Sequence, residues 1–172
     1  ESYPSSSFAY VGGGLRQKKM GITINVYAVA CYIEKTVAAS MPDKFLQAST
    51  RSEGSAEFFA DLQTSPGEKY IELRIVAPVA LSGAQMYEGL QESLKTYGVE
   101  DGEIEKIKDS LGNSMPRDSK IAFHFNGTSP KFTFSVQASG SAKVDNVIES
   151  TPLLEAFLKI YFGSTLVTGL SS

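Results

Sequence analysis

The chain has 172 residues, and we expect one domain over residues 1–172. A net charge of −3 and a sequence pI of about 5.2 argue against a nucleic-acid-binding protein, because such proteins present a basic stripe to phosphates. No apolar run approaches the ~20 residues that cross a bilayer, so no membrane span is expected.

The chain begins with two predicted strands. Its first residues, ESYPSSSF, lack an initiator Met, and we expect residues 1–7 to be a trimmed or disordered N-terminus. Residues 8–19 and 21–34 predict the strands, and the second is apolar on both faces from Val26 onward. This strand is therefore expected to be covered on both sides, with Cys31 as a buried, inert thiol.

A glycine-rich stretch and an arginine lie in the first strand. Phosphate loops run from strand to glycine turn to helix, so Gly12–Gly14 indicate a bulge or a close backbone approach instead. Arg16 follows them, and Tyr27 lies in the apolar half of the next strand. A buried arginine needs a compensating acceptor, which a ligand carboxylate can supply with the tyrosine hydroxyl as a further donor. The alternative is that Arg16 points into water near Lys18 and Lys19.

The middle of the chain predicts helices on either side of one strand. Short helices are expected within 36–49, and EKYIELRIVAP at 68–78 predicts a half-buried strand. Three further helices have caps or apolar residues at helical spacing. They cover 55–65 with Ser55 as its cap, 81–98 between a Ser82 cap and Gly98, and 100–113 with Ile104, Ile107 and Leu111 on one face.

Three strands, 120–126, 131–137 and 142–150, predict an antiparallel meander with turns at Asn126-Gly127 and Ser139-Gly140. His124 is expected to be solvated or paired across strands rather than catalytic. With one His and one Cys, a zinc site lacks its usual ligands, and no metal or cofactor is expected.

The last predicted helix, 151–163, has Thr151 as its expected cap and Pro152 at its first position. Its apolar residues leave little polar face, so it must pack between other elements. Helices grouped against a mainly antiparallel sheet define the α+β class.

Four ordered segments resemble the chalcone isomerase superfamily. They are GGGLRQKK…GITINVYAVACYIE, SAEFFADLQTSPGEKYIELRIV, LSGAQMYEGLQESLKTYG and VDNVIESTPLLEAFLKIYFG. The resemblance runs from about Val11 to Ser164. It implies an open-faced β-sandwich, in which a large antiparallel sheet is covered by one layer of helices with a cleft between them.

The resemblance also implies which residues face that cleft. The arginine of the family matches Arg16, and a catalytic-water threonine of true isomerases is replaced by Tyr27. Hydroxyl-binding Tyr and Asn positions on the cleft helix match Met86 and Ser93, although a shift of one residue would place Tyr87 there instead. A Ser or Thr on the closing helix matches Leu154.

This replacement of polar groups resembles the non-catalytic, fatty-acid-binding branch of the superfamily. The resemblance then implies a monomer that holds a long-chain fatty acid or another amphipathic small molecule, with the carboxylate on Arg16 and Tyr27. The tail would be lined by Met86, Leu90, Leu154 and Leu158, and Ser93 is a further ligand-binding candidate. It implies a plastid location. Two alternatives stay open. One is a chalcone–flavanone isomerase in which Arg16 stabilises a phenolate, and the other is a flavonoid-pathway helper without turnover.

Overall fold

The computed structural model describes residues 7–40, 56–127 and 129–163. The expected N-terminal segment, apart from Ser7, and the expected cap Ser55 lie outside these ranges. Ser7 is already tied to the fold, because its carbonyl accepts a hydrogen bond from the Lys35 amide at 2.8 Å.

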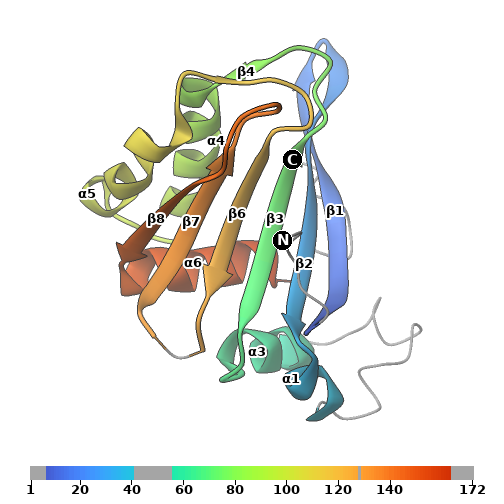
Figure 1. Cartoon of the computed structure of the whole chain (residues 1–172), viewed down its shortest axis with the longest axis vertical. Coiled ribbons are helices and arrows are strands. Elements are labelled where there is room, and N and C mark those ends of the chain that lie inside the picture. The colour runs from blue at the N-terminus through green and yellow to red at the C-terminus, as the bar shows by residue number, and fades with distance from the viewer. Residues whose placement is uncertain (1–6, 41–55, 128, 164–172) are drawn as a thin grey trace.

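A six-stranded sheet forms the body of the protein (Figure 1), and each strand pairs antiparallel with its neighbours. Its order is β1-β2-β3-β6-β7-β8, so the second half of the chain continues the sheet from β3. The strands are β1 Phe8–Met20, β2 Ile22–Glu34, β3 Lys69–Ile75, β6 Lys120–Phe125, β7 Lys131–Gln137 and β8 Val144–Glu149. The two predicted N-terminal strands and the predicted meander are confirmed.

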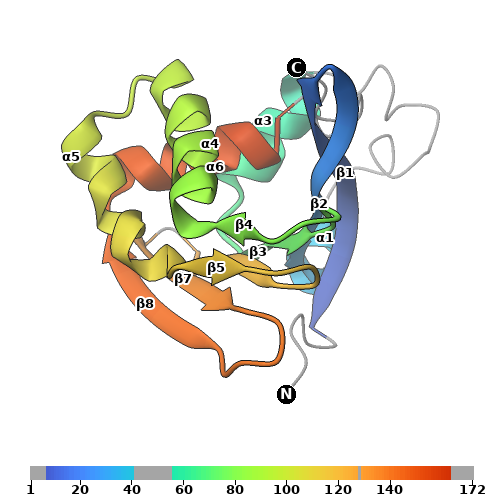
Figure 2. The ribbon, with the colours of Figure 1, turned by 90° about the horizontal axis from the view of Figure 1, so that it is seen from above.

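Helices α3, α4 and α6 gather on one side of the curved sheet (Figure 2), which gives the predicted α+β class and the open-faced arrangement. The helical elements are α1 Lys35–Ser40, α3 Ala56–Thr64, α4 Gly83–Thr96, α5 Asp101–Ile104, the 3₁₀ helix η2 Glu105–Leu111 and α6 Thr151–Tyr161. A small ladder that we did not predict joins β4 Leu81–Ser82 to β5 Ser114–Met115. No helix within the described ranges is long and apolar enough to cross a bilayer.

Helix ends follow the local sequence closely, with one correction. Ser82 caps α4 through a capping box with Gln85, and Gly98 follows the helix with φ +76°, as expected. The cap of α6 is Ser150 and not Thr151, because the Ser150 hydroxyl accepts the Leu153 amide at 3.2 Å. The extended backbone of Ser150 lets its side chain reach the third helical amide.

The sequence left open whether the glycine stretch of β1 marks a bulge or a close backbone approach, and the structure contains both. The register against β2 shifts between Tyr10 and Gly12, which marks a bulge. A Cβ on Gly13 would lie 2.2 Å from the Val29 carbonyl oxygen, so the two backbones also approach closely. The absence of a side chain at Gly13 therefore lets β1 curve tightly against β2.

The core between sheet and helices is built largely from aromatic rings. Phe123 of β6 and Phe157 of α6 have ring centroids 4.4 Å apart, and Tyr161 lies 5.8 Å from Phe123. Phe125, Phe132 and Phe134 complete this buried group. Because aromatic pairs add energy beyond area burial, these contacts fix α6 against the centre of the sheet.

Strand β3 is more buried than the predicted half-buried strand, since Lys69 and Tyr70 are buried as well. Tyr70 packs with Phe8 and Ala122 in a second apolar cluster. The Lys69 ammonium donates to the carbonyls of Ser65 at 2.5 Å and Gly67 at 3.3 Å, in the turn that joins α3 to β3. Burial lowers the pKa of Lys69 to about 8, because the charged form loses hydration.

We predict that Gly13→Ala lowers the free energy of unfolding by more than ~2 kcal/mol, because the new methyl group meets fixed backbone. Gly89→Ala is the matched control. No atom lies within 4 Å of a Cβ on Gly89, inside α4, so this change should stabilise the protein by up to ~1 kcal/mol. Urea unfolding of both variants measures these effects. A Gly13→Ala protein as stable as the wild type would contradict the close approach.

We predict that Lys69 makes the free energy of unfolding rise, relative to that of Lys69→Met, as the pH increases from about 8 toward 10. An unfolded lysine titrates near ~10.4, so below about 8 both states are charged and the burial penalty of Lys69 is fully present. Above that pH the folded state releases its proton first, which relieves a penalty on the order of 2–3 kcal/mol. Urea unfolding across this window, compared with Lys69→Met, isolates the effect. Parallel pH profiles for the two proteins would refute it.

Candidate ligand-binding site

Arg16 and Tyr27 face each other across the first two strands. They are paired in the β1–β2 register, next to a second shift between Arg16 and Gln17. Tyr27 is 9% exposed, whereas Arg16 is only partly buried. The predicted pair is therefore brought together at the border between core and surface, where a guanidinium can stay hydrated until an anion replaces water.

Tyr161, at the end of α6, joins this pair. Its side chain is hydrogen-bonded to Tyr27, and the Arg16 charge acts on both phenols. The Cys31 thiol donates to the Tyr161 carbonyl at 3.4 Å, so the same residue is attached to β2 through its backbone. Strands β1 and β2 and helix α6 thus build one cluster, Arg16–Tyr27–Tyr161.

Burial keeps both phenols neutral. It is the largest cause that raises the pKa of Tyr27, and the Tyr161 hydrogen bond and the Arg16 charge offset part of that rise. Burial also raises the pKa of Tyr161 well above its usual value, and the bond to Tyr27 raises it further. The hydrogen bond favours the ionised form of Tyr27, so the Tyr27 oxygen is its acceptor and the Tyr161 hydroxyl is its donor. The Tyr27 proton is then available to a ligand.

Arg16 supplies the positive charge of the cluster. Among the residues that the structure describes, every ion pair with a carboxylate is formed by a lysine or histidine. Arg16 takes part in none of them. A guanidinium beside a neutral phenol donor matches a carboxylate or a phenolate, because both are planar anions that accept several hydrogen bonds. The cluster is therefore a candidate anion site.

The other predicted residues divide into two groups. Met86 is buried in the same apolar cluster as Tyr27, and Leu154 packs against that cluster. The Ser93 hydroxyl instead donates to the Gly89 carbonyl of its own helix at 3.1 Å. Tyr87 packs partly against the core, with the Lys108 ammonium 5.5 Å from its ring centroid. Met86 and Leu154 thus belong to the core that Tyr27 also joins, while Ser93 bonds within its own helix.

Sequence reasoning missed Tyr161 because it read that residue as part of the apolar face of the last helix. Nothing in the helical spacing separates a tyrosine that only packs from one that also bonds. A usable signal was that Tyr27 and Tyr161 are both phenols in segments predicted to be buried. Each then needs a hydrogen-bond partner.

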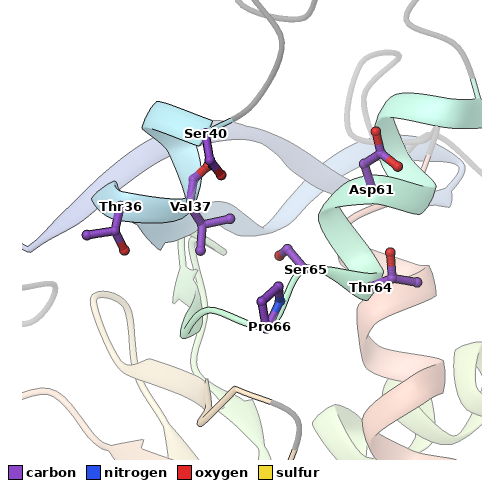
Figure 3. A pocket seen from close by; sticks show the side chains of 7 residues that line it. All are labelled: Thr36, Val37, Ser40, Asp61, Thr64, Ser65 and Pro66. Atoms are coloured by element: carbon purple, nitrogen blue, oxygen red, sulfur yellow. The ribbon is translucent and has the colours of Figure 1, made fainter.

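A cavity of about 460 Å³ lies between α1 and α3 (Figure 3). Its lining combines four hydroxyl side chains and one carboxylate with apolar groups. It is lined by Thr36, Val37, Ser40, Asp61, Thr64, Ser65 and Pro66. None of the predicted site residues belongs to it. It lies beyond the C-terminal end of β2, whereas Arg16 pairs with Tyr27 near the middle of that strand. Among the described residues, no three His, Cys, Asp or Glu side chains are placed to hold a metal ion.

Comparison with known proteins identifies the family. The chain is 31% identical over 176 residues to a chalcone–flavanone isomerase of Pyrus communis, which covers 92% of this chain and 78% of that protein. This chain belongs to the chalcone isomerase family. A chalcone–flavanone isomerase of Canna generalis is 29% identical, covering 92% of this chain and 75% of the relative. No family profile matches the chain.

The chain is also similar to an isomerase-like member of the family, chalcone isomerase-like protein 2 of Humulus lupulus. The two are 22% identical over 84% of this chain and 72% of that protein. The crystal structure of the Arabidopsis thaliana fatty-acid binding protein AtFAP1 matches with a TM-score of 0.69 at 22% identity, covering 96% of this chain and 87% of that one. The chalcone isomerase fold predicted from the sequence is thereby confirmed.

We predict that Tyr161→Phe lowers the free energy of unfolding by about 1–2 kcal/mol, since the ring packing is kept while the buried Tyr27 oxygen loses its donor. In a double-mutant cycle with Tyr27→Phe, the two changes should couple by about 1 kcal/mol. Tyr87→Phe serves as the control and should change stability by less than ~0.5 kcal/mol. Additive effects of the two buried substitutions would show that the phenols do not interact.

Proposed function

We propose that this protein binds a long-chain fatty acid without chemical conversion. Arg16 and Tyr27 receive the carboxylate, and the acyl chain lies between the sheet and helices α4 and α6. The observation that carries the proposal is the Arg16–Tyr27–Tyr161 cluster, which combines one cation with a phenol donor beside an apolar core. The matching fold of a fatty-acid binding protein supports it.

The energies assign different roles to head and tail. Each buried methylene contributes about 0.8 kcal/mol, so a dozen give roughly 10 kcal/mol before the costs of ordering. A hydrogen bond to a charged group adds about 1.5–3 kcal/mol. The tail therefore supplies most of the affinity, while the cluster decides which end of the ligand enters and discriminates against an uncharged analogue.

An acyl tail can enter only if core side chains on the helix side of the sheet move apart. Met86, Leu90 and Leu158 are buried and packed against their neighbours. An acyl chain must therefore push these side chains apart. Methionine suits this, because its unbranched side chain can repack at low cost. Leu154, which is only partly buried, provides the more exposed end of the same path.

The second candidate function is chalcone isomerisation, which the isomerase relatives favour. Arg16 would then stabilise the phenolate that develops during ring closure. The polar groups around it argue against this function. Met86 offers no hydrogen bond to a substrate hydroxyl, and the Ser93 hydroxyl is engaged by its own helix. A non-catalytic flavonoid-binding helper would use the same Arg16–Tyr27–Tyr161 cluster, and the experiment below separates the three.

We predict that native mass spectrometry and calorimetry detect a bound long-chain fatty acid in the wild-type protein, and that Arg16→Gln weakens its binding at least tenfold. That loss corresponds to one charged hydrogen bond. Arg74→Gln, which changes an exposed arginine of β3, is the matched control and should bind as the wild type does. A fatty alcohol of equal length should bind the wild type and Arg16→Gln equally.

Other outcomes would assign the protein differently. Enzyme-dependent conversion of a chalcone above the spontaneous rate, followed by absorbance, would establish an isomerase. Binding of chalcones or flavanones without turnover, with no binding of fatty acids, would establish the helper function. Equal affinity of wild type and Arg16→Gln for the fatty acid would remove Arg16 from the head-group site.

A further inference from the structure

The first hairpin projects beyond the rest of the sheet. Strand β2 pairs with β3 only from Tyr27 to Ile33, whereas β1 and β2 stay paired up to Met20 and Ile22. The segment 17–26 is therefore a two-stranded ribbon that rises above the other strands at the top of Figure 1. We call residues 18–24 of this ribbon the hairpin tip.

The hairpin tip combines exposed apolar and basic residues. Ile22 is 70% exposed, and Lys18 is exposed as well. The register pairs Lys18 with Ile24, and alternation along β2 places Ile22 on that same face. Lys19 follows directly in the sequence, and no acidic residue lies between Leu15 and Ile33. An exposed isoleucine next to lysines is unfavourable in water and favourable at an anionic, apolar boundary.

Neighbouring loops extend this surface. The Val76 and Ala77 amides donate to the Val26 carbonyl at 3.1 and 3.2 Å, which fixes the segment after β3 beside the ribbon. Val79 of that segment is 68% exposed. Arg117 is exposed in the loop before β6, next to Asp118, the acidic residue of that loop. The hairpin end thus carries an apolar and mainly basic surface on a chain whose net charge is −3.

We propose that the hairpin tip docks on the surface of an anionic lipid bilayer, with Ile22 inserted among the acyl chains and Lys18 at the head groups. A lysine near such a surface strengthens binding about fivefold, so two lysines and one isoleucine give a weak, reversible contact. Arg16 is only two residues from Lys18, about 7 Å along the strand. Docking therefore brings the anion site close to the bilayer, where free fatty acids partition.

A bilayer fits these features better than other polyanions. A nucleic acid could pair with the lysines but would leave Ile22 in water. An acidic protein surface could pair with the lysines, but a partly apolar tip at the end of a narrow ribbon matches insertion between lipid head groups. The docking surface does not depend on which ligand the Arg16–Tyr27–Tyr161 cluster holds, so the two proposals can fail separately.

A tryptophan reporter tests insertion directly, because the chain contains no tryptophan. In Ile22→Trp, the emission should shift to the blue on addition of phosphatidylcholine vesicles containing 30% phosphatidylglycerol, and much less with phosphatidylcholine alone. Val147→Trp is the matched control, since Val147 is 72% exposed on β8 at the other edge of the sheet. Equal shifts for both variants, or none for Ile22→Trp, would overturn the proposal. An equal shift with soluble polyglutamate would assign the tip to acidic proteins.

Charge reversal of the unlabelled protein provides the second measurement. The wild type should float with the anionic vesicles, and Lys18→Glu/Lys19→Glu should bind at least 25-fold more weakly. Lys35→Glu/Lys131→Glu changes the net charge equally at exposed positions away from the tip and should float as the wild type does. Equal loss in both double variants would mean that only net charge matters.

Fatty-acid affinity without vesicles, measured on the same variants, separates this proposal from the proposed function. Lys18→Glu/Lys19→Glu should retain that affinity within about threefold while losing vesicle binding. A wild type that floats but binds no fatty acid would sustain docking and refute the carrier function. A wild type that binds fatty acid but never floats with the vesicles would sustain the carrier function and refute docking.

Discussion

The hydrogen bond between Tyr27 and Tyr161 links the two layers of this fold at the place where its chemistry is concentrated. Tyr27 belongs to β2 and Tyr161 to α6, and both are buried. Two phenols in an apolar interior must satisfy each other or lose stability. Their bond therefore holds the helix over the sheet and also orients the donor beside Arg16. The packing of α6 and the geometry of the candidate anion site depend on the same contact, so a change in one alters the other.

The secondary structure could largely be predicted from the sequence, because the decisive signals were local. Alternation gave the strands, and glycines with positive φ marked the end of α4 at Gly98 and the turn after β6 at Gly127. The errors in the predicted secondary structure concerned geometry that local sequence patterns do not encode. Ser150 and Thr151 are equally good capping residues, and only the extended backbone at Ser150 decides between them. The change from α5 to the 3₁₀ helix η2 and the β4–β5 ladder depend on packing that no periodicity encodes.

The candidate site was harder to predict than the fold. Arg16 and Tyr27 were found because a charge and a phenol stood out in an apolar strand, and the hairpin register then paired them. Tyr161 was not predicted as a site residue, because the pattern of an amphipathic helix treats tyrosine as one more apolar residue. Ser93 was matched to a ligand position through the resemblance alone, which carries no information on its hydrogen bond to the Gly89 carbonyl in the preceding turn.

The position of α6 in the chain has a consequence for how the protein reaches its native state. Phe157 and Tyr161 supply the inner wall against Phe123 of β6, and the Cys31 thiol reaches across to the same helix. These contacts join residues separated by up to 130 positions. During synthesis the aromatic face of the sheet stays uncovered until α6 has left the ribosome. The nascent chain is thus vulnerable to aggregation until this helix can pack.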